Sequence, residues 1–334
     1  RFVADFDTDM ELLRERVPQK TRGKVAVIGS GPAGLTVAGD LARQGFGVTI
    51  FDSQEEAGGV LMYGIPEYRL PKAVVRKEIE KIEALGVTFV LKCVVGRDIT
   101  VDQMFEMGYD AIFIGTGTSL PNDLNVPGSK LHGIVQSSYL LHMVSIYNQN
   151  IVDRSHVPMK IGENVGIIGC GNVAMDAART ALRMGAASVS VIYHRTEAEM
   201  SATPTEYQEA VNEGIKFLWE TSTKEFIGND DGKVTGIRAD TPEGEKEIPF
   251  DRIFLAIGSR PANRIVSTTT GIDVDKYGYV IIKERPYGMT TRKGVFAGGD
   301  VVHHPQTVVL AMKAAKQVAA GIAQYVDAVK LLES

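Results

Sequence analysis

The sequence of 334 residues has few cysteines, a single tryptophan and no long apolar run, and these shortages exclude several classes of protein. Its two cysteines, Cys93 and Cys170, lie far apart in the chain and cannot form a CxxC redox pair. Two thiols are also too few for an iron–sulfur cluster, which normally takes four thiolates. We expect both to be reduced thiols in a cytoplasmic protein.

No apolar stretch reaches the roughly 20 residues that a membrane-spanning helix requires. The longest candidate, residues 308–329, is interrupted by Lys313, Lys316 and Asp327, so we expect a packed helix and no membrane contact. The formal net charge of -5 disfavours a nucleic-acid partner, because affinity for a phosphate backbone depends on concentrated lysine and arginine. The first residues lack the charged and then apolar regions of a secretory leader, so we expect none. From its start at Arg1 rather than Met, we expect a piece of a longer protein.

What the sequence does contain is a repeated pattern of strand, glycine turn, helix and second strand. The pattern occupies residues 25–52 and again residues 165–193. This order of elements is typical of a βαβ unit with a parallel sheet. Each copy also ends in a similar apolar run followed by glycine, at residues 111–117 and 253–259. The sequence therefore predicts an α/β fold with two Rossmann-like dinucleotide-binding domains.

The segment that follows the second copy is expected to return to the first domain, so that the second domain is inserted into the first. Residues 279–282 and 295–297 have the composition of strands, and a long helix is expected from about Gln306. The expected domains are a lead-in at residues 1–20, a first dinucleotide-binding domain at 21–155 and 271–334, and a second dinucleotide-binding domain at 156–270.

Both glycine turns lie between a strand and a helix, which is the setting that the GxGxxG motif requires. The first glycine permits the tight turn, and the second lets a pyrophosphate approach the backbone. The third position, Gly34 or Ala174, lets the helix pack on the strand. The helix N-terminus then offers N–H groups and a partial positive charge to the phosphates. Two motifs in this setting predict two nucleotides.

The end of the second strand indicates which nucleotide each domain prefers. Asp52 ends that strand in the first copy, where a carboxylate accepts hydrogen bonds from ribose hydroxyls and repels a 2′-phosphate. Alignment of the copies places Tyr193 at that position, followed by His194 and Arg195. Because arginine pairs with phosphate through a bidentate fork, the second domain should prefer NADP to NAD. The alternatives are that Asp52 is a surface charge and that Arg195 only solvates a loop.

A further aspartate, Asp300, follows a strand and precedes a helix. It could hydrogen-bond the ribityl chain of a flavin, and the helix start at Thr307 and Val308 could direct its N–H groups at the isoalloxazine ring. We expect the neighbouring His303 and His304 to form a loop beside the flavin and not a metal site. The residues expected from these patterns to line the nucleotide sites are Gly29, Gly31, Pro32, Ala33, Gly34, Asp52, Gly115, Thr116, Gly117, Gly169, Gly171, Asn172, Val173, Ala174, His194, Arg195, Gly258, Gly299, Asp300, Thr307 and Val308.

Three stretches, residues 58–72, 171–179 and 199–206, give the chain a family resemblance that covers almost its whole length. The chain resembles the small (beta) subunit of NADPH-dependent glutamate synthase. It also resembles the flavoprotein modules of NADH-dependent ferredoxin:NADP oxidoreductase and dihydropyrimidine dehydrogenase. The resemblance implies FAD in the first domain, NADPH in the second, and an iron–sulfur domain or large synthase subunit as partner. It also implies that Gly59, Leu61 and Arg69 contact cofactor.

Two departures from this family accompany the resemblance. The family's cysteine-rich N-terminal domain, which ligates iron–sulfur clusters, has no counterpart in this sequence. Residues 311–316 and the pair His303 and His304 also replace glycines or small residues, which could alter flavin packing.

The expected activity is transfer of hydride from NADPH to FAD, followed by export of electrons. Hydride transfer between two stacked rings depends on positioning, so no side chain is expected to act as a general acid or base. Two alternatives remain at this point. One is a non-catalytic dinucleotide-binding scaffold or redox sensor, and the other is a flavoenzyme acting alone, such as a ferredoxin-NADP reductase.

Overall fold

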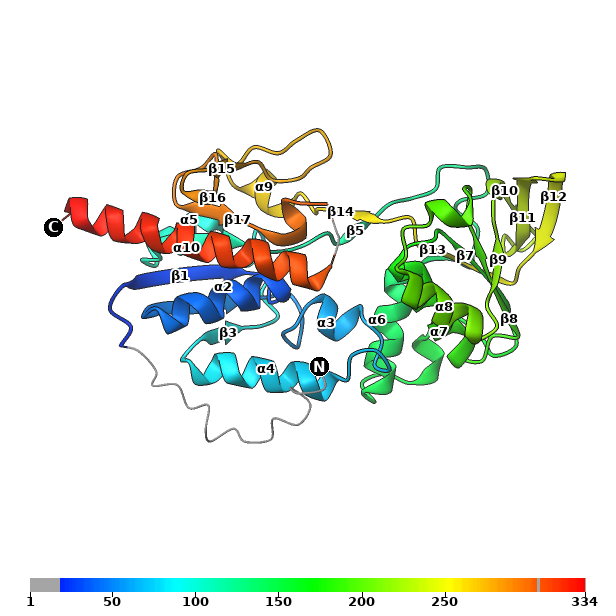
Figure 1. The fold of residues 1–334 in the computed structure, drawn as a ribbon, viewed down its shortest axis with the longest axis horizontal. Coiled ribbons are helices and arrows are strands. Elements are labelled where there is room, and N and C mark those ends of the chain that lie inside the picture. Colours follow the sequence, from blue (N-terminus) through cyan, green and yellow to red (C-terminus); the bar gives the residue numbers. More distant parts are fainter. Residues whose placement is uncertain (1–18, 305–306, 334) are drawn as a thin grey trace. The chain divides into compact units, whose positions relative to one another are not determined.

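The computed structural model describes residues 19–304 and 307–333, which form two compact units (Figure 1). Of the described residues, unit 1 contains 19–62, 72–120, 260–304 and 307–333. Unit 2 consists of Tyr63–Pro71 and Pro121–Ser259. Along the chain, unit 2 is thus inserted into unit 1. A short segment of residues 63–71, called the excursion below, also belongs to unit 2.

Unit 1 is built on a seven-stranded sheet with the strand order β15-β16-β17-β4-β1-β2-β3. The five strands from β17 to β3 are parallel, and β15 and β16 add an antiparallel edge. The strands are β1 (Gly23–Ile28), β2 (Phe46–Phe51), β3 (Thr88–Val90), β4 (Ala111–Ile114), β15 (Ile282–Glu284), β16 (Tyr287–Thr290) and β17 (Val295–Ala297).

The central strands of unit 1 are almost continuously apolar because helices cover both faces of a parallel sheet. All four residues of β4 are buried, and so are residues 25–28 of β1. The helices of unit 1 are α2 (Pro32–Arg43), α3 (Val60–Tyr63, which ends at the boundary with unit 2), α4 (Lys72–Ala84), α5 (Val101–Glu106), α9 (Arg264–Thr268), the 3-10 turn η3 (Gly299–Val301) and α10 (Val308–Glu333).

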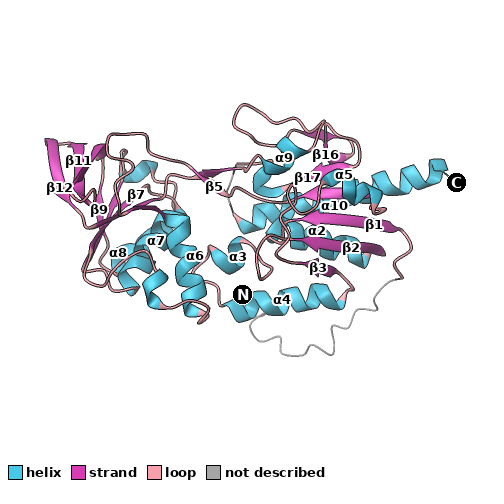
Figure 2. Ribbon diagram, turned by 180° about the vertical axis from the view of Figure 1, so that it is seen from behind, coloured by secondary structure: helices cyan, strands magenta, loops and turns pink. Residues whose placement is uncertain are grey.

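Unit 2 is built on a five-stranded parallel sheet with the order β6-β13-β7-β8-β9. A separate antiparallel sheet, β10-β11-β12, follows β9 in the chain. The strands are β6 (Ile134–Gln136), β7 (Asn164–Ile168), β8 (Ser188–Ile192), β9 (Lys216–Leu218), β10 (Ser222–Gly228), β11 (Val234–Thr241), β12 (Gly244–Pro249) and β13 (Arg252–Leu255). The helices are α6 (Ser137–Asn148), η1 (Arg154–His156), α7 (Asn172–Arg183), η2 (Glu197–Glu199) and α8 (Pro204–Asn212), and Figure 2 shows helices beside the strands of each unit.

The boundaries of the units differ from the expected domain ranges at both crossings. The chain enters unit 2 at Pro121, because β6 pairs with β13 and thereby joins the sheet of unit 2. It leaves unit 2 at Ser259, and α9 already belongs to unit 1. The strands at these crossings, β5 (Leu120–Pro121) and β14 (Ser259–Arg260), pair with each other.

The two parallel sheets are built alike. β17, β4, β1, β2 and β3 of unit 1 take the same places as β6, β13, β7, β8 and β9 of unit 2. In each unit the glycine turn joins the central strand to the helix that precedes its neighbour. The expected α/β architecture of two Rossmann-like domains is therefore confirmed.

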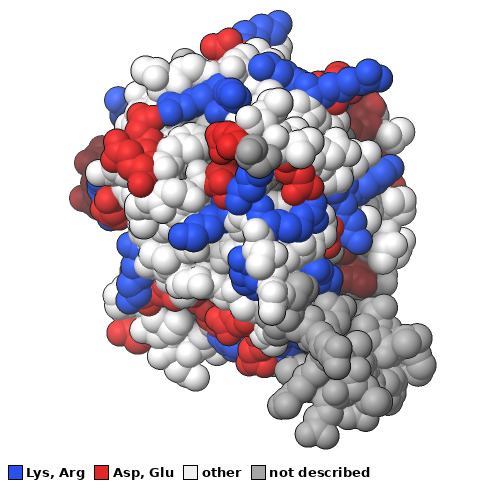
Figure 3. All heavy atoms as spheres, turned by 90° about the vertical axis from the view of Figure 1, so that its left-hand side faces the viewer, with Lys and Arg blue, Asp and Glu red and all other residues white. Residues whose placement is uncertain are grey.

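The surface shown in Figure 3 carries basic and acidic side chains interspersed, without a large area of one sign. Among the described residues, no helix is long and apolar enough to cross a membrane. The same residues contain no cluster of His, Cys, Asp and Glu that could hold a metal ion.

Candidate functional site

The glycine turn of unit 1 has the close packing that its motif predicts. A Cβ added to Gly34 would lie 1.9 Å from the carbonyl oxygen of Gly29, so α2 can approach β1 only without a side chain there. Gly29 has a φ of +98°, and its Cβ would lie 2.6 Å from the oxygen of Gly115. A Cβ at Gly31, in contrast, would meet no atom within 4 Å. The first and third glycines are required by the fold, whereas the second borders open space.

The N-terminus of α2 faces this space without a competing side chain. Its N-cap is Gly31, no side chain caps it, and its first turn contains no acidic residue. Pro32 begins the helix with the backbone geometry that a first turn needs, and Ala33 follows it. N–H groups left without partners at a helix start favour an anion. The turn therefore fits a nucleotide pyrophosphate.

Three other predicted segments meet at the same turn. A Cβ at Gly59 would lie 2.9 Å from the Cα of Gly31. A Cβ at Gly299 would lie 2.8 Å from the Cβ of Ala33. The Gly115–Thr116 backbone lies against Gly29, and Gly117, with a φ of +61°, has no atom within 4 Å of its Cβ position. The structure thus brings together segments of unit 1 that are far apart in the sequence.

Asp52 is bound to the turn itself. Its Oδ2 accepts hydrogen bonds from the backbone N and the Oγ of Ser30 at 2.7 and 2.5 Å, and its Oδ1 accepts one from Gln54 N at 2.9 Å. Asp52 is buried, as is Ser30. The surface-charge alternative for Asp52 is therefore wrong. Its contact with a ribose stays a prediction.

Asp300 lies in η3, directly after Gly299, and is partly buried. Burial raises the pKa of its carboxyl above the ordinary range, and the nearby His303 acts in the opposite direction. Thr307 caps α10, because its Oγ1 accepts a hydrogen bond from Leu310 N at 3.3 Å, and Val308 is the first residue of that helix. Both η3 and α10 follow β17 in the chain, and Gly299 of η3 lies against Ala33 of the glycine turn.

The glycine turn of unit 2 repeats the design. Gly169 has a φ of +119°, and its Cβ would lie 2.3 Å from the oxygen of Ala256. Gly171 is the N-cap of α7, again with no side-chain cap and no acidic residue in the first turn. Ala174 is fully buried in the third position, whereas Val173 is half exposed. A Cβ at Gly258 would lie 3.5 Å from Nδ2 of Asn122, also in unit 2.

The loop after β8 is exposed and carries Arg195, the residue that we expect to bind the 2′-phosphate. Arg195 donates from Nε to Nε2 of His194 at 3.1 Å. Glu199 accepts hydrogen bonds from the backbone and hydroxyl of Thr196, and these bonds hold its pKa below the ordinary range. Tyr193 donates to the carbonyl of Glu199 at 3.0 Å, so the loop folds back towards β8.

Arg69 forms ion pairs with two carboxylates of unit 2. It belongs to the excursion in unit 2, where its Nη1 contacts both oxygens of Asp176 at 2.7 Å and its Nη2 contacts Glu206 at 2.6 Å. Leu61, in α3 of unit 1, accepts a hydrogen bond at its carbonyl from Nζ of the buried Lys72 at 2.8 Å. A role of Arg69 or Leu61 in cofactor binding stays a prediction.

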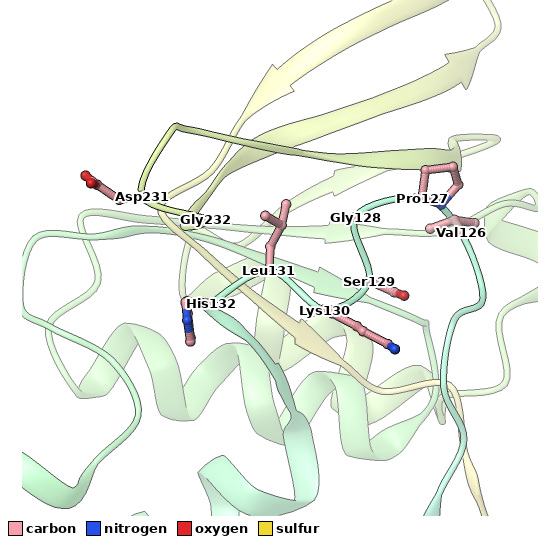
Figure 4. Close-up of a pocket in the computed structure, with 9 residues that line it drawn as sticks. All are labelled: Val126, Pro127, Gly128, Ser129, Lys130, Leu131, His132, Asp231 and Gly232. Atoms are coloured by element: carbon pink, nitrogen blue, oxygen red, sulfur yellow. The ribbon is translucent and has the colours of Figure 1, made fainter.

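An open pocket elsewhere in unit 2 contains none of the predicted residues (Figure 4). It lies between the loop of residues 126–132 and the turn at Asp231 and Gly232. None of the residues that line it belongs to α7 or β8.

Sequence reasoning missed the residues that hold the two turns in place. Ser30 occupies a variable position of the glycine motif, and only its contact with Asp52 shows its role. In unit 2 the oxygen of Cys170 accepts from Ser201 N at 3.2 Å and Ala202 N at 3.0 Å. Burial raises the pKa of the Cys170 thiol to about 11, with a smaller effect from Glu197. No spacing in the sequence indicated these contacts.

The arrangement has counterparts among known proteins. Residues 23–315 match the family model described as pyridine nucleotide-disulphide oxidoreductase. The chain is 36% identical over 327 residues to the glutamate synthase [NADPH] small chain of Halomonas elongata, which covers 92% of this chain and 69% of the relative. It is 35% identical to a putative glutamate synthase [NADPH] small chain of Cereibacter sphaeroides, over 90% of this chain and 76% of the relative.

Other relatives are longer. The putative oxidoreductase AegA of Escherichia coli is 34% identical over 91% of this chain, which spans only 49% of that protein. The chain therefore spans about half to three quarters of the curated relatives named here.

Solved structures show the same fold. FprA of Mycobacterium tuberculosis in complex with NADPH has a TM-score of 0.75 at 17% identity, covering 92% of this chain and 85% of FprA. Thioredoxin reductase of Lactococcus lactis has a TM-score of 0.70 at 24% identity, covering 91% of this chain and 99% of the reductase. The match to the family model and to these relatives indicates an NAD(P)H oxidoreductase with the FAD- and NAD(P)-binding fold, against the non-catalytic alternative. The chain belongs to the pyridine nucleotide-disulphide oxidoreductase family, in the group that includes the small chains of NADPH-dependent glutamate synthase.

Proposed function

We propose that unit 1 binds FAD, that unit 2 binds NADPH, and that the chain passes electrons from NADPH through the flavin to an iron–sulfur partner. FAD, when bound, supplies a ring that accepts a hydride and can release its electrons singly. The chain itself has to bind both nucleotides, hold their reactive rings in line and keep competing acceptors away.

The convergence of three segments on the glycine turn of unit 1 carries the proposal. Gly31 borders the open space, Gly59 and Gly115 approach from two other loops, and Gly299 brings Asp300 to the first turn of α2. Such a cradle offers backbone N–H groups to a pyrophosphate and a carboxylate to a polyol. A simple packing turn would not require a half-buried Asp300 at its edge.

The choice of NADPH for unit 2 rests on the loop after β8. The residue after β2 is the carboxylate Asp52, whereas the residue after β8 is Tyr193, followed by His194 and the exposed Arg195. A guanidinium forms bidentate hydrogen bonds with a phosphate, and no carboxylate at position 193 repels it.

The proposed partner supplies the iron–sulfur clusters. The cysteines of this sequence are Cys93 and Cys170, so it cannot furnish the four thiolates that a cluster normally takes. Glutamate synthase small chains are among the relatives, so a large synthase subunit or a separate iron–sulfur domain is the proposed acceptor. The free cysteines also support a reducing, cytoplasmic compartment.

A two-step assay tests the proposal. The FAD-loaded protein should oxidise NADPH when ferricyanide is the acceptor, and its flavin absorbance near 450 nm should bleach under anaerobic NADPH. With glutamine and 2-oxoglutarate in place of ferricyanide, no glutamate should form from this chain alone. No turnover with ferricyanide in flavin-loaded protein would contradict the proposal. Rapid reduction of added ferredoxin without any other subunit would favour the stand-alone reductase.

A further inference from the structure

Different hydrogen bonds hold the glycine turn in place in each of the two units. In each unit the first glycine of the turn donates its N–H to the last residue of the second strand, Phe51 or Ile192. The next position is therefore equivalent in the two turns, and it holds Ser30 in unit 1 and Cys170 in unit 2. Only the serine carries a hydroxyl that can both donate and accept a strong hydrogen bond.

The Ser30 hydroxyl uses both capacities. It donates to Oδ2 of Asp52 at 2.5 Å and accepts from the backbone N of Gly58 at 3.1 Å. Ser30 is 0% exposed, and Asp52 and Gly58 are also buried. One hydroxyl thus connects the glycine turn, the end of β2 and the loop of residues 57–62.

This connection lies where two loops are in direct contact. A Cβ at Gly59 would come within 2.9 Å of the Cα of Gly31, so the second loop lies against the turn without room for side chains. Gly59 itself has a φ of +53° and begins the turn in which Met62 N donates to its carbonyl at 3.0 Å. A small displacement of residues 57–62 would therefore change the shape of the nucleotide site around the glycine turn.

Unit 2 achieves the corresponding connection without that hydroxyl. The loop after β8 is fastened through the carbonyl of Cys170, which accepts from Ser201 N and Ala202 N. It is fastened again through Oδ1 of Asn172, which accepts from Thr203 N at 2.9 Å. The Asn172 side chain therefore links the start of α7 to the segment that follows β8.

We propose that Ser30 is a positioning residue of the flavin site, whose hydroxyl holds the glycine turn and the loop of residues 57–62 in the arrangement that receives the dinucleotide. The inference rests on the proposed binding of FAD to unit 1. Without the hydroxyl, the buried N–H of Gly58 loses its partner, and Asp52 loses one of its three donors. The loop then has to be ordered by FAD itself, and that ordering weakens binding.

The test compares Ser30→Ala with two control variants in the full chain, using apoprotein prepared from the FAD-loaded form. Thr36→Val is the matched control, because the Thr36 hydroxyl lies on helix α2, which follows the turn, and donates to the carbonyl of Pro32 at 2.7 Å. Ser30→Ala should weaken FAD binding about 10- to 100-fold, measured by quenching of flavin fluorescence. Thr36→Val should leave it within about twofold. Most of the loss should appear as slower association, because the loop must order during binding.

Asn172→Ala provides the crossed comparison. Affinity for NADP⁺ is followed through Trp219, the single tryptophan of the sequence, which lies in unit 2. Ser30→Ala should leave this affinity unchanged, whereas Asn172→Ala should lower it and leave FAD binding unchanged. Equal FAD affinity of wild type and Ser30→Ala, a loss confined to faster dissociation, or a parallel loss at both nucleotide sites would overturn the inference. Failure of the wild-type apoprotein to bind FAD would instead overturn the proposed function.

Discussion

The guanidinium of Arg69 contacts both carboxylate oxygens of Asp176 at 2.7 Å, although the two residues are 107 positions apart in the chain. Asp176 is 5% exposed, and Arg69 also pairs with Glu206 at 2.6 Å. Arg179, on the same helix as Asp176, continues the network to Glu213 at 2.7 Å. The excursion of residues 63–71 is thereby fixed to helices α7 and α8. These ion pairs give Arg69 a structural role in unit 2.

Arg69→Met should destabilise unit 2 by about 3 kcal/mol, because it removes the ion-pair partner of the buried Asp176, whereas Glu206 keeps Arg179 at 3.5 Å. Unfolding in urea, followed by the fluorescence of Trp219, measures the change. Arg97→Met is the matched control, since the ion pair of Arg97 with Asp98 is on the surface, and its stability should not change measurably. Unchanged unfolding of Arg69→Met together with weaker FAD binding would show that Arg69 serves the cofactor instead.

The pH dependence of stability should carry a contribution from Asp176. Burial raises the pKa of its carboxyl to about 6, although Arg69 acts to lower it. The unfolded chain releases this proton near pH 4. Between about pH 4 and 6 the folded state therefore holds one proton more, so the unfolding free energy falls as pH rises, by roughly 3 kcal/mol in total.

Asp176→Asn removes this titration. The wild-type unfolding free energy, measured relative to that of Asp176→Asn, should fall from about pH 4 to 6 and stay level above about pH 7. Urea titrations at intervals of half a pH unit would measure the difference. A difference that stays constant across this range would mean that the carboxyl is ionised throughout.

Asp300→Ala should weaken FAD retention about 5- to 150-fold, because a charge-assisted hydrogen bond worth about 1–3 kcal/mol is lost. Asp102→Ala is the control in the same unit, since Asp102 forms an ion pair with Arg292 on the exposed side of α5. The dissociation constant of FAD measures the loss of affinity, and circular dichroism of both variants checks that the fold is unchanged. Unchanged affinity with full flavin occupancy would show that Asp300 does not reach the cofactor.

Local patterns predicted the parts of the site that depend on neighbours in the chain. Gly29, Gly31 and Gly34 were found from their spacing, because the turn between β1 and α2 has its own geometric requirements. The meeting of Gly299 with Ala33 could be anticipated only from the expected return of the chain to the first domain. It depends on the addition of β17 beside β4.

Other features depend on tertiary contacts that leave no trace in local spacing. Strand β6 has three residues and is defined by its pairing with β13, so the start of unit 2 was placed too late in the chain. The partners of Arg69 lie on α7 and α8, and the sequence around Arg69 carries no sign of them. The same holds for Ser30, whose position in the motif accepts many residue types.

Arg195→Glu should lower the affinity for NADPH about 30- to 150-fold and leave that for NADH nearly unchanged, because only NADPH carries the 2′-phosphate. The altered loop stays anchored to the sheet, since Glu220 N donates to the carbonyl of Arg195 and Thr221 N donates to that of Tyr193. Lys246→Glu, a charge reversal on β12 of the same unit, is the control and should affect neither nucleotide. Steady-state kinetics with ferricyanide as acceptor, run with both nucleotides, separates the effects. Equal losses with NADPH and NADH would mean that Arg195 shapes the loop and does not recognise the phosphate.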